Sequence, residues 1–424
     1  MRFQPIERIA GRTTVPGDKS ISHRALILAA MAEGVSHIAN AAPGADVRST
    51  AKALNSFGTK VEHQDGAYFV ESKGWFPADG VNVDCANSGS TMRLLAGMLA
   101  GAKGRFVLEG DASLSARPMD RIGLPLIEMG SNVKMRDARF APIAITGAPL
   151  KGIVHEPAVP SAQVKSCILL AGLSAEGTTK VIEKQPTRDH TERLLRWLGI
   201  EVASHGREIS VQGQGRYPTL EPFDLRVPGD ISSASYLIAA ACLARGSKLR
   251  IEDVGLNPSR TGFLDVIALM GADVTIEKGD EGYEPNGNLV IAYRDLQGID
   301  IDHAMVTSCI DEVPLLALLA TSAQGLTCIT GADELRVKES DRIRTTVQNL
   351  KRLGANIEET PDGMRIEGPT RLHGGRVDSH GDHRTALTCA TASCAATDAI
   401  EIDGWEVADV SFPGFEELMF QVAE

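Results

Sequence analysis

An apolar segment that follows a short polar turn recurs six times along the chain. The first copy, residues 16–34, reads PGDKSISHRALILAAMAEG. The turn at residues 16–18 and the run of Ala and Leu after it predict a buried helix, capped by Ser20 or Ser22 and closed by Gly34. The other five copies begin at residues 86, 160, 228, 308 and 380.

The spacing of these copies indicates a tandem repeat. The glycines that close the first five copies, at positions 34, 104, 177, 246 and 325, lie about 70 to 80 residues apart. In five copies a second helix follows, runs into a glycine and continues as a β-branched strand; these glycines are Gly58, Gly130, Gly199, Gly271 and Gly354. The sixth copy is truncated and ends in FEELMF. The pattern predicts an α/β protein of six units.

Composition agrees with a compact soluble protein, because 43% of the 424 residues are hydrophobic and 23% are charged. Since one core rarely spans this length, we expect two domains of three units each. There is no run of about 18 apolar residues and the N-terminus lacks an apolar signal core, so we expect a cytoplasmic protein. The seven cysteines include no CxxC pair, which predicts reduced core thiols rather than disulfides or a metal site.

A net charge of −12 argues against nucleic acid or an anionic membrane as the partner. The cations gather instead at the predicted turns: Lys19, Arg24, Arg93, Arg117, Arg121, Lys165, Arg188, Lys338, Arg342, His383 and Arg384. This clustering indicates a small anionic ligand, a phosphate or a carboxylate, bound near helix N-termini. The alternative for each cation is a solvated cap.

Acid and base candidates lie in the second half of the chain. Asp311 and Glu312 precede the apolar run VPLLALLA, where a carboxylate can accept a proton from a substrate hydroxyl or merely cap the helix. Residues 338–342 place a carboxylate between two cations. A metal at His380 and His383 is disfavoured, because no third ligand is evident.

Several motifs, in order and at matching spacing, resemble those of the 5-enolpyruvylshikimate-3-phosphate (EPSP) synthase family. They are Lys19-Ser20 with Arg24, residues 87–93 (NSGSTMR), 110–119 (GDASLSARPM), 160–166 (PSAQVKS), 336–344 (RVKESDRIR), 382–384 (DHR) and 411–415 (SFPGF). The resemblance covers nearly the whole chain. PSAQVKS and the segment TRDHTE are more similar to the second bacterial group of the family.

The resemblance implies a transferase that needs no metal or organic cofactor. It would move the enolpyruvyl group of phosphoenolpyruvate to the 5-hydroxyl of shikimate 3-phosphate, on the shikimate pathway to aromatic amino acids. Its implied catalytic residues are Asp311 as base, Glu339 as proton donor and acceptor, and Lys19. The implied shikimate 3-phosphate contacts are Lys19, Ser20, Arg24, Ser161, Ala162, Gln163, Arg188, Asp311 and Lys338. The implied phosphoenolpyruvate contacts are Lys19, Gly89, Arg117, Gln163, Arg342 and Arg384.

The same resemblance implies a fold of two domains, each with three βαβαββ units, helices inside and sheets outside, that close over a cleft. Because the chain would cross between the domains twice, we expect one domain at residues 18–228 and the other at 1–17 plus 229–424. We expect a monomer, and Gly89 leaves room for the herbicide glyphosate. Val410 stands where the family's first group has a lysine, which leaves one phosphoenolpyruvate contact open.

Two other functions are weighed against this one. UDP-N-acetylglucosamine enolpyruvyl transferase shares the fold and chemistry, but its relatives carry a reactive cysteine before the Arg-Pro loop. This chain has no cysteine between Cys85 and Cys167. A non-catalytic ligand-binding relative is disfavoured because Asp311, Glu339 and Lys19 are all present.

Overall fold

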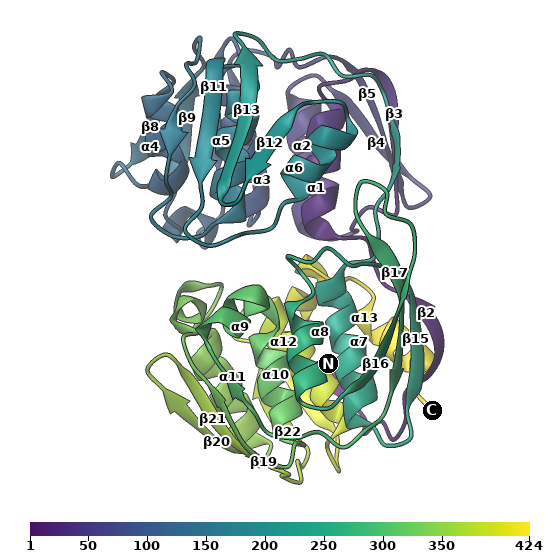
Figure 1. Cartoon of the computed structure of the whole chain (residues 1–424). Coiled ribbons are helices and arrows are strands. Elements are labelled where there is room, and N and C mark those ends of the chain that lie inside the picture. The colour runs from purple at the N-terminus through teal and green to yellow at the C-terminus, as the bar shows by residue number, and fades with distance from the viewer. The chain divides into compact units, whose positions relative to one another are not determined.

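The computed structural model describes all residues, 1–424, and divides into two compact units (Figure 1). One unit comprises residues 1–16 and 228–424, and the other residues 17–227. The boundaries expected from the sequence each lie one residue further along the chain.

The 17–227 unit contains three four-stranded sheets, with the strand orders β14-β3-β5-β4, β6-β7-β9-β8 and β10-β11-β13-β12. The strands are β3 (Glu33–Ala39), β4 (Lys60–Gln64), β5 (Ala67–Lys73), β6 (Val81–Asp84), β7 (Arg105–Glu109), β8 (Asn132–Arg136), β9 (Phe140–Thr146), β10 (Val154–His155), β11 (Glu176–Ile182), β12 (Val202–His205), β13 (Glu208–Gln214) and β14 (Asp224–Arg226). The helices are α1 (Lys19–Ala29), α2 (Ala45–Ser56), α3 (Gly89–Ala100), η1 (Leu114–Ala116), α4 (Asp120–Glu128), α5 (Ala162–Gly172) and α6 (His190–Trp197).

The other unit contains the sheets β16-β17-β15-β2, β18-β19-β21-β20 and β1-β23-β22. Its strands are β1 (Arg2–Phe3), β2 (Ala10–Thr14), β15 (Lys248–Gly255), β16 (Asp273–Lys278), β17 (Asn286–Ala292), β18 (Asp300–Ile301), β19 (Gly325–Ile329), β20 (Asn356–Thr360), β21 (Gly363–Gly368), β22 (Gly375–Asp378) and β23 (Ile400–Asp403). Its helices are α7 (Ile231–Leu243), α8 (Gly262–Leu269), α9 (His303–Ser308), η2 (Ile310–Glu312), α10 (Val313–Ala320), η3 (Asp333–Val337), α11 (Arg342–Arg352), α12 (His383–Thr391), η4 (Ala392–Cys394), η5 (Trp405–Val410) and α13 (Phe415–Val422).

Five sheets share one topology, which confirms the predicted βαβαββ repeat. In each sheet a first strand runs parallel to a second, and a hairpin completes the sheet antiparallel to the second strand; β6 pairs in parallel with β7, for example, and β9 runs antiparallel to both β7 and β8. The sixth sheet has three strands, and β1 takes the antiparallel place beside β23. The truncation predicted for the last copy is therefore confirmed.

Two first strands are exchanged between repeats. β2 precedes α1 in the chain but pairs in parallel with β15, whereas β14 precedes α7 but pairs in parallel with β3. Each unit thus completes one of its sheets with a strand that lies next to a crossing of the chain. The repeat pattern alone did not predict this exchange.

The first helix of each copy is buried, as its apolar run predicted, and within each unit these helices are enclosed by the sheets (Figure 1). Close packing requires small residues at their contacts. A Cβ on Gly97 of α3 would lie 2.3 Å from the carbonyl oxygen of Cys167 in α5, so the two helix backbones touch there.

Two details of the first helix were predicted wrongly. Asp18, rather than Ser20 or Ser22, caps α1, because its side chain accepts a hydrogen bond from the amide of Ile21 at 2.9 Å. Gly34 does not close the helix, which ends at Ala29; it lies in β3 with φ of 132°, a backbone conformation that favours glycine.

The glycines predicted to end the second helices are confirmed in that role. Gly58, Gly130, Gly199, Gly271 and Gly354 each lie two residues after the last residue of their helix, with φ between 80° and 109°. Directly after Gly58 in the chain, the amide of Thr59 donates a hydrogen bond to the carbonyl of Leu54, as in a Schellman motif.

Candidate active site

The predicted site residues fall into two sets, one in each unit. In the 17–227 unit they are Lys19, Ser20, Arg24, Gly89, Arg117, Ser161, Ala162, Gln163 and Arg188. In the other unit they are Asp311, Lys338, Glu339, Arg342 and Arg384.

Lys19 is the first residue of α1, and Ser20 is the second. A lysine is unfavourable at the positive end of a helix dipole, and here Asp46 compensates it, since Oδ2 lies 3.1 Å from Nζ. The lysine side chain is still 26% exposed. The start of α1 is therefore a cationic, partly accessible place with helix amides beside it.

Arg24 is nearly buried and connects three helices. Its Nε donates to Thr191 Oγ1 at 2.7 Å, Nη2 to Ser166 Oγ at 2.8 Å and Nη1 to the carbonyl of Ser20 at 2.8 Å. These bonds fasten α1 to α5 and α6. Arg24 thus has a structural function in this unit besides the substrate contact expected from the sequence.

The start of α3 brings three predicted residues together. A Cβ on Gly89 would lie 2.9 Å from Arg93 Nη1 and 3.7 Å from Arg117 Nη1. Arg93 donates to Gln163 Oε1, and Arg117 Nη2 donates to Asn87 Oδ1 at 2.8 Å. The absence of a side chain at Gly89 leaves two guanidinium groups close to the helix amides, an arrangement suited to an anion.

The start of α5 joins this group. Ser161 caps the helix by accepting from the amide of Val164 at 3.4 Å, and Ala162 is the first helical residue. Gln163 Nε2 donates to Ser90 Oγ at 2.8 Å. The N-termini of α3 and α5 are therefore connected by side-chain hydrogen bonds.

A buried polar chain supports these helices from inside. His23 Nδ1 of α1 lies 2.7 Å from Thr50 Oγ1 of α2, and Thr50 Oγ1 lies 2.7 Å from Thr91 Oγ1 of α3. Thr91 Oγ1 donates to Ser88 Oγ, the cap of α3, at 2.7 Å. His23 is 0% exposed, and this burial lowers the pKa of its imidazole to about 3.

We expect His23 to make the protein less stable in mild acid. Between pH 6.5 and about 3 the unfolded state binds a proton at His23 that the folded state excludes, so the free energy of unfolding falls as pH falls through this window. His23→Gln, which keeps a hydrogen-bonding group, should lose about 3 kcal/mol less than the wild type between pH 7.5 and 4.5. Urea unfolding at both pH values measures this difference, and equal losses in the two proteins would contradict it.

In the other unit, Arg342 gathers three carboxylates. The first residue of α11, it is 2% exposed, and its guanidinium lies 2.8 Å from Asp382, 2.6 Å from Glu339 and 3.4 Å from Asp311. Asp311 Oδ2 also lies 3.8 Å from Arg384 Nη2. The side chains of Asp311 and Glu339 are 20% and 25% exposed, so both predicted acid/base residues are accessible on one buried cation.

The charges in this group stabilise one another. Burial lowers the pKa of Arg342, but the carboxylates of Asp382, Glu339 and Asp311 raise it above its ordinary value. Burial raises the pKa of Asp382, whereas Arg342 brings it below the ordinary range. Asp382 also caps α12, because its Oδ1 accepts from the amide of Arg384 at 2.9 Å.

Glu312 lies next to Asp311, and no distinct role was predicted for it. It is 4% exposed, accepts from Ser232 Oγ at 2.5 Å and lies 3.3 Å from Arg384 Nη1. Arg384 is thus held between Glu312 and Asp311. The available signal for a role of Glu312 was its position directly after the candidate base Asp311. Its hydrogen-bond partner Ser232 is 80 residues away in the chain.

Two further predicted contact residues, Arg188 and Lys338, lie outside the helices and strands. Arg188 is partly exposed in the segment between β11 and α6. Lys338 follows η3, and its Nζ lies 2.7 Å from Glu334 Oε1. Asp189 is the N-cap residue of α6, and its Oδ2 lies 2.9 Å from Arg193 Nε.

Metal ligands and cysteine thiols are the other groups that could carry chemistry. No group of three or more His, Cys, Asp or Glu side chains is arranged to hold a metal ion. All seven cysteines are free thiols, six of them buried, which agrees with the core role predicted for them. Burial raises the pKa of the Cys85 and Cys167 thiols to about 12, so neither is a ready nucleophile.

Known proteins of one family resemble this chain over nearly its whole length. A family model described as EPSP synthase (3-phosphoshikimate 1-carboxyvinyltransferase) matches residues 3–419. The 3-phosphoshikimate 1-carboxyvinyltransferase of Desulfitobacterium hafniense is 46% identical over 429 residues, covering 100% of this chain and 98% of the relative. That of Acidithiobacillus ferrooxidans is 48% identical over 422 residues, covering 99% and 96%.

Solved structures lead to the same family. An EPSP synthase from Acinetobacter baumannii superposes with a TM-score of 0.90 at 40% identity, over 100% of this chain and 98% of that one. The enolpyruvyl transferase NikO from Streptomyces tendae, at 17% identity, shares the fold with a TM-score of 0.81 over 100% of this chain and 97% of its own. With the six repeats, the arginine-bound carboxylates and the matching family model, the chain belongs to the EPSP synthase family.

Proposed function

We propose that the chain transfers the enolpyruvyl group of phosphoenolpyruvate to the 5-hydroxyl of shikimate 3-phosphate and releases phosphate. Family membership supports this reaction. The observation that carries it to particular residues is the group around Arg342, in which two partly exposed carboxylates, Asp311 and Glu339, contact one buried guanidinium. The reaction needs one base and one acid, together with cations that bind two phosphorylated substrates.

The chemical roles follow from the two carbon–oxygen bonds that change. The bond to the attacking hydroxyl oxygen forms, and the bond to phosphate breaks. Asp311 accepts the proton of the attacking hydroxyl, and Glu339 protonates the methylene carbon of phosphoenolpyruvate, which makes the adjacent carbon electrophilic. The hydroxyl oxygen adds there and gives a tetrahedral adduct. Glu339 then removes a proton from the new methyl group, and phosphate leaves. Lys19 stabilises the negative charge that develops between the substrates.

The proposed binding residues are those expected from the sequence. For shikimate 3-phosphate they are Lys19, Ser20, Arg24, Ser161, Ala162, Gln163, Arg188, Asp311 and Lys338. For phosphoenolpyruvate they are Lys19, Gly89, Arg117, Gln163, Arg342 and Arg384.

Phosphate release by the purified protein tests this function. We expect release with phosphoenolpyruvate and shikimate 3-phosphate together and none with either alone. Release with UDP-N-acetylglucosamine instead would favour the other enolpyruvyl transferase. Calorimetric binding of both substrates without release would favour a non-catalytic relative.

Gly89→Ala should weaken phosphoenolpyruvate binding. The new Cβ would lie 2.9 Å from Arg93 Nη1, so that guanidinium must move, together with its bond to Gln163. We expect KM for phosphoenolpyruvate to rise about tenfold, with a smaller change in KM for shikimate 3-phosphate. Steady-state kinetics measure both constants. Gly282→Ala is the control, since nothing lies within 4 Å of its Cβ, and equal effects of the two variants would contradict the assignment.

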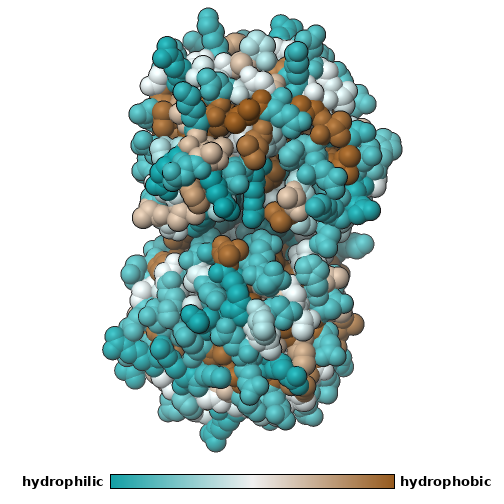
Figure 2. Space-filling view, turned by 90° about the vertical axis from the view of Figure 1, so that its left-hand side faces the viewer, coloured by the Kyte–Doolittle hydropathy of each residue, from teal (hydrophilic) through white to brown (hydrophobic).

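The remaining proposals concern inhibition, assembly and location. We propose glyphosate as an inhibitor, and undiminished activity at millimolar glyphosate would contradict this. We propose a monomer, since on the face that Figure 2 shows the apolar side chains lie in separate groups among hydrophilic ones. None of the helices combines the length and the apolar character that a membrane-spanning segment requires. We propose the cytoplasm because all cysteines are free thiols. Each compact unit is proposed as one domain.

A further inference from the structure

A buried lysine in the 17–227 unit makes three polar contacts that no proposed reaction step uses. Lys165, in the first half of α5, is 1% exposed. Its Nζ lies 2.7 Å from Glu192 Oε1, 3.1 Å from Glu183 Oε1 and 3.3 Å from the carbonyl oxygen of Thr187. A lysine ammonium has three N–H donors, so each has one acceptor here.

These acceptors enclose the segment that carries Arg188. Glu183 follows the last residue of β11, Thr187 directly precedes Arg188, and Glu192 lies in the first turn of α6. Lys165 therefore contacts both ends of a segment that has no helix or strand of its own between residues 183 and 189.

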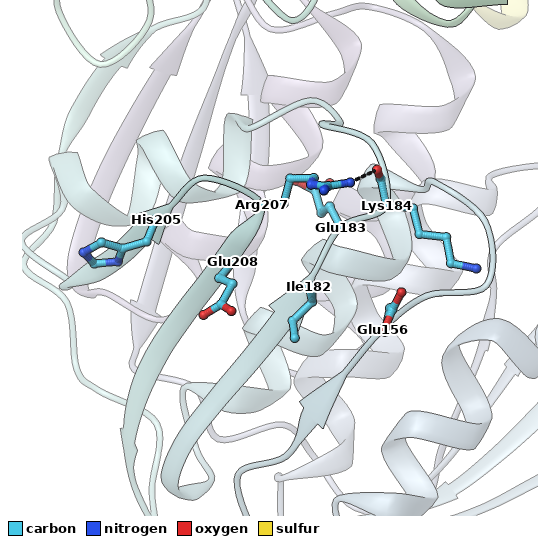
Figure 3. A pocket seen from close by; sticks show the side chains of 7 residues that line it. All are labelled: Glu156, Ile182, Glu183, Lys184, His205, Arg207 and Glu208. Atoms are coloured by element: carbon cyan, nitrogen blue, oxygen red, sulfur yellow. Dashed lines mark hydrogen bonds between the residues drawn. The ribbon is translucent and has the colours of Figure 1, made fainter.

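The segment also has contacts that do not involve Lys165. Glu183 Oε1 accepts from the amide of Thr187 at 3.1 Å and from its hydroxyl. Figure 3 shows Glu183 and Lys184 beside Arg207 of the β12–β13 turn, whose Nη1 donates to the Lys184 carbonyl at 2.8 Å. The amide of Glu183 donates to the Arg207 carbonyl at 2.9 Å. Glu183 is thus a fixed anchor between the sheet and Lys165.

Burial of this charge cluster is costly, so its presence requires a reason. Ordinary apolar residues would pack α5 against α6, but they would not fix the carbonyl of Thr187, one residue before Arg188. We infer that Lys165 is a positioning residue that, with Glu183 and Glu192, holds the 183–189 segment so that Arg188 is presented to the phosphate of its substrate. The inference rests on the proposed contact between Arg188 and shikimate 3-phosphate.

A charge-matched variant tests this inference. Lys165, Glu183 and Glu192 together have a formal charge of −1. The double substitution Lys165→Gln with Glu192→Gln leaves only the charge of Glu183, so the formal charge is again −1. The control is the double substitution Lys180→Gln with Glu208→Gln. These residues form an exposed ion pair on β11 and β13, with the same 2.7 Å separation as Lys165 and Glu192. If the cluster variant fails to fold, Glu192→Gln alone serves, with smaller effects.

Amide hydrogen exchange reads out the position of the segment without any activity. We expect residues 184–189 to exchange faster in the cluster variant and at the wild-type rate in the control. Unchanged exchange in the cluster variant would overturn the inference. A wild-type protein without phosphate release would contradict the proposed function but would leave this exchange result standing.

Kinetics then test whether the cluster acts through Arg188. We expect the cluster variant and Arg188→Gln each to raise KM for shikimate 3-phosphate at least about tenfold, with little change in kcat or in KM for phosphoenolpyruvate. In the Arg188→Gln background the cluster substitutions should add less than about threefold, because the group they position is gone. Fully multiplicative effects, or an unchanged KM in either variant, would overturn the inference.

Discussion

Asp311→Asn is expected to lower kcat by about 10² to 10⁴, because the amide cannot accept the proton of the attacking hydroxyl. The substitution keeps the size of the side chain and an oxygen that can accept from Arg342, which now lies 3.4 Å from Asp311. KM for the two substrates should therefore change much less than kcat. Steady-state phosphate release, with circular dichroism to show that the fold is retained, measures both quantities.

A matched control separates this effect from a general loss of charge. Asp333, at the start of η3, is exposed and lies in the same unit. Asp333→Asn should leave kcat unchanged. A kcat for Asp311→Asn within tenfold of the wild-type value would contradict the assignment of Asp311 as the base.

Asp382→Asn is expected to lower the free energy of unfolding by about 3 kcal/mol at pH 7.5, because it removes one carboxylate from a buried ion pair. Asp382 is 0% exposed and lies 2.8 Å from Arg342 Nε. The asparagine can still cap α12, so the loss reports the charge. Since Arg342 lowers the folded-state pKa of Asp382, the contribution is present at neutral pH and is lost as pH falls through that pKa.

Guanidinium unfolding curves measure this loss, with Asp403→Asn as the control. Asp403 pairs with Arg376 at the same kind of distance, 2.7 Å, but on an exposed surface. Its removal should leave the unfolding midpoint nearly unchanged. Equal midpoints for wild type and Asp382→Asn would show that Asp311 and Glu339 suffice to compensate Arg342.

The sequence predicted those features that depend on local pattern. The repeat, the buried first helices and the glycines after the second helices, such as Gly58 with φ of 96°, each follow from residues close together in the chain. The prediction of the N-cap of α1 was wrong, although capping depends only on neighbouring residues. Asp18 and Ser20 are both good caps, and only the position at which the helix begins decides between them.

Features that depend on contacts between distant residues were not predicted. The bond between Ser232 and Glu312 spans 80 residues, and that between Arg342 and Asp382 spans 40. The exchange of β2 and β14 depends on sheet pairing across more than 180 residues, for which the repeat gives no signal. The candidate residues were thus named from motifs, whereas the contacts that hold them required the structure.

One measurement tests the addition and elimination directly. The reaction is run in D2O with phosphoenolpyruvate and shikimate 3-phosphate, and the methylene carbon of the enolpyruvyl product is examined by NMR for deuterium. In D2O Glu339 delivers a deuteron and makes that carbon a CH2D group, and loss of one of its two protons, rather than of the deuteron, leaves deuterium in the product. We predict deuterium in the product of the wild type and no product with Glu339→Gln. A product formed without deuterium would contradict the account.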